Sequence, residues 1–194
     1  MNHLAHLVLA GNEPAMLLGA ILGDHVKGRL KGEFNKEVER GIRLHRAIDA
    51  FTDHHPDVKQ SQRQFNPHFR RYSGIMLDVF FDYLLARSWQ TYYESDLNEF
   101  SSGVLTTLIK QADQLPARAM QQVQRMHAMN SLASHGEDRY LEGAFSHLAT
   151  RLKRDNPLTE AFDECQQNYA ALDTVFRAFY PKLQSFAEDW KQQH

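Results

Sequence analysis

Histidine and aspartate side chains recur at helical spacing in the segment GIRLHRAIDAFTDHHP, residues 41–56. His45, Asp49 and Asp53 are successively four residues apart, so on one helix their side chains project along a single face. Mixed imidazole and carboxylate donors suit a divalent metal ion, which can activate water and hold a phosphodiester for in-line attack. The alternative for His45 and Asp49 is a hydrogen-bonded pair on the helix surface.

A second pair of carboxylates interrupts the apolar segment GIMLDVFFDYLLA, residues 74–86. Asp78 and Asp82 again stand four residues apart, and the surrounding residues predict a largely buried helix. Two unpaired carboxylates in a low-dielectric site would raise each other's pKa, so they need a metal ion, an arginine partner, a shared proton or a helix terminus to cap. A divalent cation is the simplest of these explanations.

Two further signals lie nearer the start of the sequence. Asp24 follows the apolar run LLGAILG, residues 17–23, beside glycines that allow the backbone to approach a ligand closely. His6 is equally compatible with a metal ligand and with a packed core histidine. Four other histidines of this region are expected to be solvated or to pack: His3, His25, His55 and His68.

Helices must position these residues, because apolar side chains recur at helical spacing over most of the chain and strand-like alternation is nearly absent. Further helices are expected at about 97–111, 116–131, 138–153 and 158–190. Pro56 and Pro157 favour helix starts, and the Asn66-Pro67 step favours a stop. Pro181 predicts either a stop or a kink. The pattern therefore predicts an all-α, irregular helical bundle, with residues 1–194 forming a single domain.

The composition fits an ordinary soluble globular domain of 194 residues, with 42% hydrophobic and 24% charged residues. A formal net charge of −2 gives no overall attraction to nucleic acid or to an anionic membrane. Residues 25–71 nevertheless carry 11 basic and 6 acidic side chains; this surface either docks an acidic partner or a phosphate-bearing substrate, or is simply solvated. The lone Cys165 is expected to be a small buried hydrophobe, and no apolar run is long enough to span a membrane, so we expect a cytoplasmic protein.

Five blocks of the chain resemble, in order and spacing, the bacterial acyl carrier protein phosphodiesterases. They are MNHLAHLVLA, LLGAILGDHVKG, GIRLHRAIDAFTDHHP, RRYSGIMLDVFFDYLLA and YAALDTVFRAFYP, which extend from residue 1 to about residue 181. The resemblance implies a metal-dependent hydrolase, usually supported by Mn²⁺ with Mg²⁺ or Fe²⁺ as other candidates, that removes 4′-phosphopantetheine from holo-acyl carrier protein. It also implies a divergent HD-type phosphohydrolase fold, although the chain lacks an adjacent His-Asp doublet.

The resemblance also implies roles for individual residues. The expected metal ligands are Asp24, His45, Asp49 and Asp78. Asp82 or Asp53 would orient or deprotonate the attacking water. Arg46 would clamp the phosphodiester, and His6 would join the catalytic group. Tyr83 stands where relatives often carry a histidine, so an imidazole at that position is not essential in this chain.

An acidic carrier protein would dock on the basic half of the chain, around Lys27, Arg29, Arg40, Arg43, Arg63, Arg70 and Arg71. Arg43, Arg63, Arg70 and Arg71 are the expected substrate-binding residues, and binding should weaken with added salt. Nucleic acid and membranes are not expected as partners. Two other functions remain open: a phosphohydrolase of the same chemistry acting on a nucleotide or another small phosphate ester, and a non-catalytic module that binds an acidic carrier protein.

Overall fold

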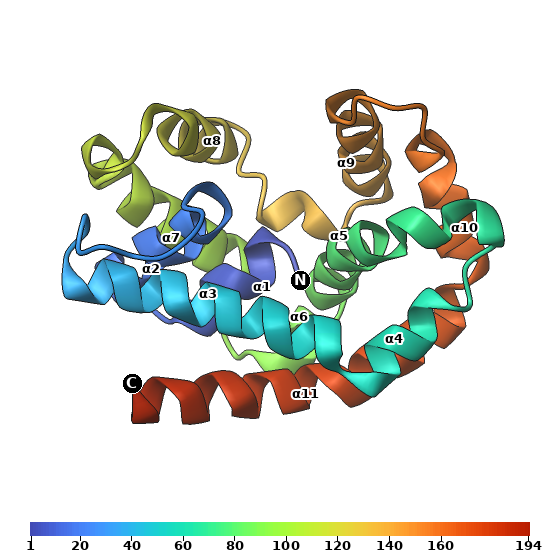
Figure 1. Ribbon diagram of the computed structural model, residues 1–194, viewed down its shortest axis with the longest axis horizontal. Coiled ribbons are helices and arrows are strands. Elements are labelled where there is room, and N and C mark those ends of the chain that lie inside the picture. The colour runs from blue at the N-terminus through green and yellow to red at the C-terminus, as the bar shows by residue number, and fades with distance from the viewer.

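Helices account for all the regular structure in the computed structural model, which describes residues 1–194 and contains no strand (Figure 1). The eleven α-helices are α1 (His3–Ala10), α2 (Pro14–His25), α3 (Lys36–His54), α4 (Pro56–Gln62), α5 (Ser73–Arg87), α6 (Trp89–Tyr92), α7 (Leu97–Lys110), α8 (Ala117–Ala128), α9 (Asp138–Arg151), α10 (Ala161–Gln167) and α11 (Tyr169–Gln193). Four 3₁₀ helices connect them: η1 (Pro67–Tyr72), η2 (Ala112–Gln114), η3 (Ala133–Gly136) and η4 (Leu158–Glu160). The prediction of an all-α fold is confirmed.

Proline marks the helix boundaries largely as predicted. Pro56 is the first residue of α4, and Pro67 begins η1 after α4 has ended. Pro181, for which a stop or a kink was open, lies inside α11, where its exposed position lets the unpaired carbonyl of Arg177 face water. The prediction of a single helix over 158–190 is wrong. The helix is interrupted at Asn168, whose side chain donates to the carbonyl of Glu164 at 2.9 Å.

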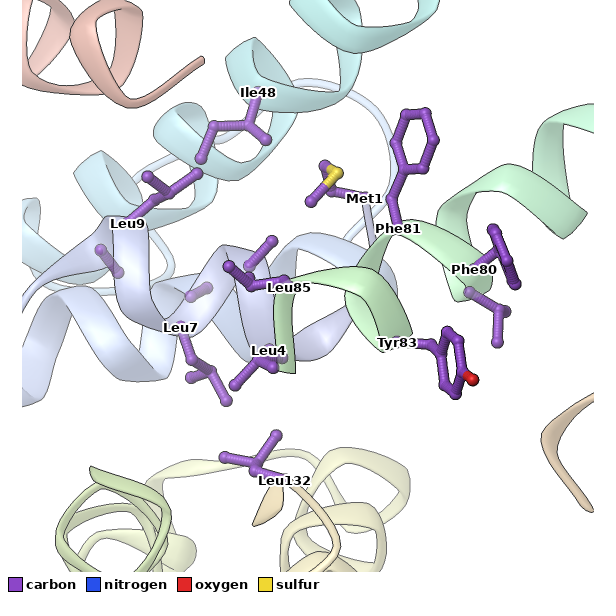
Figure 2. Close-up of a cluster of buried hydrophobic side chains, with 14 of the residues drawn as sticks. Met1, Leu4, Leu7, Leu9, Ile48, Phe80, Phe81, Tyr83, Leu85 and Leu132 are labelled. Atoms are coloured by element: carbon purple, nitrogen blue, oxygen red, sulfur yellow. The ribbon is translucent and has the colours of Figure 1, made fainter. Parts of the chain in front are cut away.

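The short helix α1 lies in the middle of the molecule. Apart from His3 and His6 all its residues are apolar, as a buried helix requires, and Leu4, Ala5 and Leu7 have no exposed surface. Figure 2 shows α1 surrounded by side chains of other elements, with Ile48 of α3 on one side and Leu132 on the opposite side. A polar residue on α1 is therefore held in place by the hydrophobic core itself.

Helices α2 and α3 touch through glycine. A methyl group on Gly19 would stand 2.5 Å from the Cα of Gly41, so the two backbones meet directly there. Gly19 contacts Gly41, and further along both helices Gly23 contacts His45, so the two helices run in the same direction. The loop 26–35 must therefore run back along the pair, while α11 packs beneath α3 and α4 (Figure 1).

None of these helices is both long enough and apolar enough to cross a membrane.

Candidate metal centre

Three side chains from two helices meet between α1 and α3. Nε2 of His6 lies 3.1 Å from Oδ1 of Asp49, and Nε2 of His45 lies 3.3 Å from Oδ2 of the same carboxylate. The donor atoms of all three residues fall within 4.8 Å of one another. The four-residue spacing of His45 and Asp49 places both on one face of α3, and buried α1 brings in His6.

A hydrogen bond on the side of the ring away from Asp49 fixes the orientation of the His45 imidazole. Its Nδ1 lies 2.7 Å from the carbonyl oxygen of Ala20 and donates to it. The ring fits because residue 23 is glycine: a Cβ there would lie 2.1 Å from Cγ of His45. In the neutral ring Nε2 then carries a lone pair toward the Asp49 carboxylate, an arrangement that requires a cation, either a proton or a metal ion, between the two.

The surroundings of His6 keep its imidazole neutral. Its ring stacks on that of His45 with centroids 3.7 Å apart and planes 10° apart. Burial lowers the pKa of His6 to about 4, although the neighbouring Asp49 opposes the shift. Two positive rings stacked in this way would repel each other, so at neutral pH His6 is neutral, and a metal ion would take the place of the proton that its Nε2 shares with Asp49.

The carboxylates lie at the open edge of the cluster. Burial disfavours the charged form of Asp49, but its hydrogen bonds with His45 and His6 outweigh this and hold the pKa of Asp49 well below its usual range. Asp24, at the end of α2, places Oδ1 3.7 Å from Nε2 of His45. The side chains of Asp24 and Asp49 are 48% and 45% exposed, so a ligand can reach the cluster from this edge.

Three further residues form a hydrogen-bonded chain beside Asp24, and they were not expected to take part. Gln122 of α8 accepts from Nε2 of His25 at 2.8 Å and donates to Nε2 of His3 at 3.1 Å. His3 therefore carries its proton on Nδ1, which faces Oδ2 of Asp24 at 3.6 Å. No sequence pattern indicates Gln122, whereas His3 could have been found from its three-residue spacing to His6 on one helix.

Asp82, expected near the water, lies instead beneath the N-terminus of α1. It has no exposed surface and accepts from the backbone N–H groups of Leu4 at 2.7 Å, Asn2 at 3.1 Å and Ala5 at 3.4 Å. Burial raises the pKa of Asp82 to about 6 even though these amides favour the carboxylate. The contact corresponds to the helix-capping alternative, since the carboxylate satisfies the free N–H groups that begin a helix.

Asp78 and Asp53 lie beside the cluster rather than in it. Oδ1 of Asp78, expected to bind metal, is 2.6 Å from the amino group of Met1. Partial burial raises the pKa of Asp78 against the effect of that amino group, and the charges of Asp49 and Asp53 add to the rise. Asp53 is exposed one turn beyond Asp49 on α3, so it faces the same side of the helix as the cluster.

The expected arginines fall into two groups. Arg46 donates to the carbonyl oxygens of Gly28 at 2.9 Å and Val26 at 2.8 Å, and Arg43 pairs with Glu39 at 2.7 Å. Arg63, which directly follows α4, and Arg70 and Arg71 of η1 are exposed; α4 and η1 lie at the other end of the molecule from the loop 26–35 (Figure 1). The structure therefore does not bring the predicted substrate-binding arginines together.

The donor set fits a divalent transition metal. Two imidazole nitrogens and one carboxylate converge with a second carboxylate at their edge, and imidazole favours manganese, iron or zinc over calcium. The hydrogen bond from His45 to Ala20 is the outer-shell contact typical of a metal-binding histidine. The fold and the cluster thus define an all-helical protein with a candidate divalent-metal centre.

Comparison with known proteins places the chain in a family. The model of the acyl carrier protein phosphodiesterase family matches residues 1–183, and the chain belongs to that family. Relatives named acyl carrier protein phosphodiesterase include those of Pectobacterium atrosepticum, 32% identical over 189 residues, and Serratia proteamaculans, 33% identical over 190 residues. Each alignment covers 97% of this chain and 98% of the relative.

No solved structure matches the chain with significance. The family resemblance inferred from the five sequence blocks is confirmed, whereas the HD-type fold stays a prediction.

Proposed function

We propose that this protein is a metal-dependent phosphodiesterase that hydrolyses holo-acyl carrier protein to apo-acyl carrier protein and 4′-phosphopantetheine, in the cytoplasm. The observation that carries the proposal is the cluster of His6, His45 and Asp49, which is buried on one side and open at its carboxylate edge. The names of the relatives supply the substrate. A buried, unpaired Cys165 is compatible with a reducing compartment.

His6, His45 and Asp49 would hold the metal, with Asp24 closing the shell at the open edge. Manganese is the favoured ion, and Mg²⁺ or Fe²⁺ are the other candidates. Such an ion, when bound, polarises the phosphodiester and lowers the pKa of water. Asp78 lies outside this set because its carboxylate contacts the Met1 amino group.

The reaction requires water to attack phosphorus as the bond from phosphorus to the serine oxygen breaks, with a proton passing to that oxygen. Asp53 is the favoured group to orient the water or accept its proton, because it is exposed and lies one turn from Asp49 on the same face of α3. Asp82 acts instead by capping the helix that carries His6. His3, with its Nδ1–H directed to Asp24, would fix the orientation of that carboxylate.

The test is to incubate metal-stripped protein with purified holo-acyl carrier protein, with and without Mn²⁺, and to follow the intact mass of the carrier. We expect loss of phosphopantetheine only with metal, and we expect the Asp49→Asn variant to lose at least about a hundredfold in rate. Free coenzyme A and nucleotides are assayed in parallel. Turnover of nucleotides alone would favour the small-ester hydrolase, and binding of the carrier without turnover in any divalent ion would favour a non-catalytic module.

A further inference from the structure

The loop between α2 and α3, residues 26–35, presents three cations at the surface. Lys27, Arg29 and Lys31 are exposed, and none of them forms an ion pair, unlike Arg40 and Arg43 on the following helix. Alternate positions of this segment, here called the basic loop, thus carry charge that the protein itself does not neutralise. The segment also carries one exposed carboxylate, Glu33, so its charge is net positive and attracts an anionic partner.

Apolar residues fasten the basic loop to the body of the protein. Val26, Leu30 and Phe34 follow one another at intervals of four, and all three are partly buried against the hydrophobic core. The cations occupy positions between them, so packing of the apolar residues directs the charged side chains outward. The loop is therefore a surface feature with a defined inner and outer side.

Polar contacts from α3 hold the loop at two further points. Arg46 donates to the carbonyl oxygens of Gly28 and Val26, and Gly32 donates its N–H to Oε1 of Glu39 at 2.8 Å. Gly28 and Gly32 both have φ of 77°, a conformation in which a side chain would be strained. A loop tied at this many places keeps its cations in position before any partner arrives.

The basic loop also lies next to the candidate metal centre. Lys27 is three residues after Asp24, so their Cα atoms are at most about 11 Å apart. Arg46, which ties down the start of the loop, is the neighbour of His45 in the sequence. Figure 1 places α4 and η1 at the far end of the molecule; Arg63 follows α4, and Arg70 and Arg71 belong to η1.

We propose that the basic loop is the docking element for the acidic carrier protein, and that Arg46 is a positioning residue for this loop rather than a clamp on the phosphodiester. The proposal rests on the proposed function. An acidic helical partner that contacts Lys27, Arg29 and Lys31 would place its modified serine beside the open carboxylate edge of the cluster. Because the loop is already ordered, little conformational entropy is lost when the partner binds.

A pair of double variants with equal change in charge tests the docking element. Lys27→Glu with Arg29→Glu alters the basic loop, and Arg70→Glu with Arg71→Glu is the matched control at the far end. At low salt we expect the loop variant to raise KM for holo-acyl carrier protein by about tenfold or more with kcat retained, and to flatten the salt dependence of kcat/KM. The control should change KM by less than about threefold, since η1 lies at the other end of the molecule from the basic loop (Figure 1).

Three results would overturn the proposal: an unchanged KM in the loop variant, an equal rise in the control, or a loss of bis(p-nitrophenyl) phosphate hydrolysis in the loop variant, which would place the damage at the metal centre. Failure of the proposed function is distinguishable, because the wild-type protein would then release no phosphopantetheine. Direct binding of the carrier to wild-type and loop variants would still test docking in that case.

Arg46→Gln tests the positioning role separately. We expect faster hydrogen exchange in residues 26–35 and a rise in KM for the carrier protein resembling that of the loop variant, because the carbonyls of Val26 and Gly28 lose their donor. A fall in kcat with unchanged KM and unchanged exchange would mean that Arg46 contacts the reacting phosphate, and would overturn its assignment to the loop.

Discussion

The chemistry of the site depends on the exact placement of single side chains, above all the imidazole of His45. Spacing along α3 was enough to predict that His45 and Asp49 share a face, because a helix repeats every 3.6 residues. The third donor, His6, could not be chosen in this way, since 39 residues of sequence separate it from His45. The same spacing at Asp78 and Asp82 led to a different contact, because periodicity does not reveal which helix terminus a carboxylate will meet.

Gly23→Ala tests the placement of His45 at the residue scale. The added methyl group would stand 2.1 Å from the imidazole, so the ring must turn away from Asp49 and the hydrogen bond to Ala20 must break. We expect Mn²⁺ affinity, measured by calorimetry, to fall by at least about tenfold.

Gly103→Ala is the matched control, because a methyl group on this α7 glycine meets nothing within 4 Å. It should leave Mn²⁺ binding intact and add up to about 1 kcal/mol of stability by favouring the helix. Equal metal affinity in the two variants would show that the His45 ring does not define the centre.

Helix α1 is the element on which the site depends most. It is eight residues long and would not be stable alone; the apolar core holds its sides and Asp82 holds its N-terminus. An apolar octapeptide can be predicted to be buried, but its capping residue cannot be predicted, because the cap comes from α5, nearly eighty residues later. Asp82 thus links the stability of the fold to the position of His6.

Asp82→Ala tests this link at the scale of the element. Removing a buried carboxylate that accepts three backbone hydrogen bonds should lower the free energy of unfolding by about 3 kcal/mol in urea titration. Asp96→Ala removes the exposed cap of α7, which accepts from Asn98 and Glu99, and should cost only about 1 kcal/mol.

The metal response separates the two cap variants further. The thermal stabilisation given by Mn²⁺ should shrink in Asp82→Ala, because His6 is less well placed, and should be retained in Asp96→Ala. If Mn²⁺ stabilises Asp82→Ala as much as it stabilises the wild type, then α1 keeps its position without the carboxylate.

At the scale of the whole molecule, the all-helical architecture followed directly from the hydrophobic pattern, because helix-forming periodicity extends over most of the sequence. The break at Asn168 and the close contact of Gly19 with Gly41 did not follow, since both depend on which helices pack together. The molecule also buries a third histidine, His135, whose Nδ1 donates to the carbonyl of Ser131 and whose Nε2 lies 3.8 Å from Asp82.

His135 should make the fold sensitive to acid. Burial lowers its pKa to about 4, while in the unfolded chain it titrates near 6.5. Its contribution to stability is therefore present above about pH 6.5 and is lost as the pH falls to 4, by about 3 kcal/mol in all. Asp82 has the opposite sign, because its pKa is raised to about 6 and folding favours its protonated form at low pH.

Urea titrations of the wild type and of His135→Asn at several pH values isolate the histidine contribution. The asparagine keeps a donor for Ser131 but has no proton to gain. The wild type should lose about 3 kcal/mol more than the variant between pH 7 and pH 4. A difference between the two proteins that stays constant with pH would show that His135 does not titrate on unfolding.

The most direct test of the account is the position of manganese in crystals grown with Mn²⁺, located by anomalous diffraction. We predict one strong peak at about 2.0–2.3 Å from Nε2 of His6, Nε2 of His45 and a carboxylate oxygen of Asp49, with Asp24 at the open side. A peak held by Asp53 and Asp78 instead, or no peak at the histidine pair at saturating Mn²⁺, would contradict the assignment of this cluster as the metal centre.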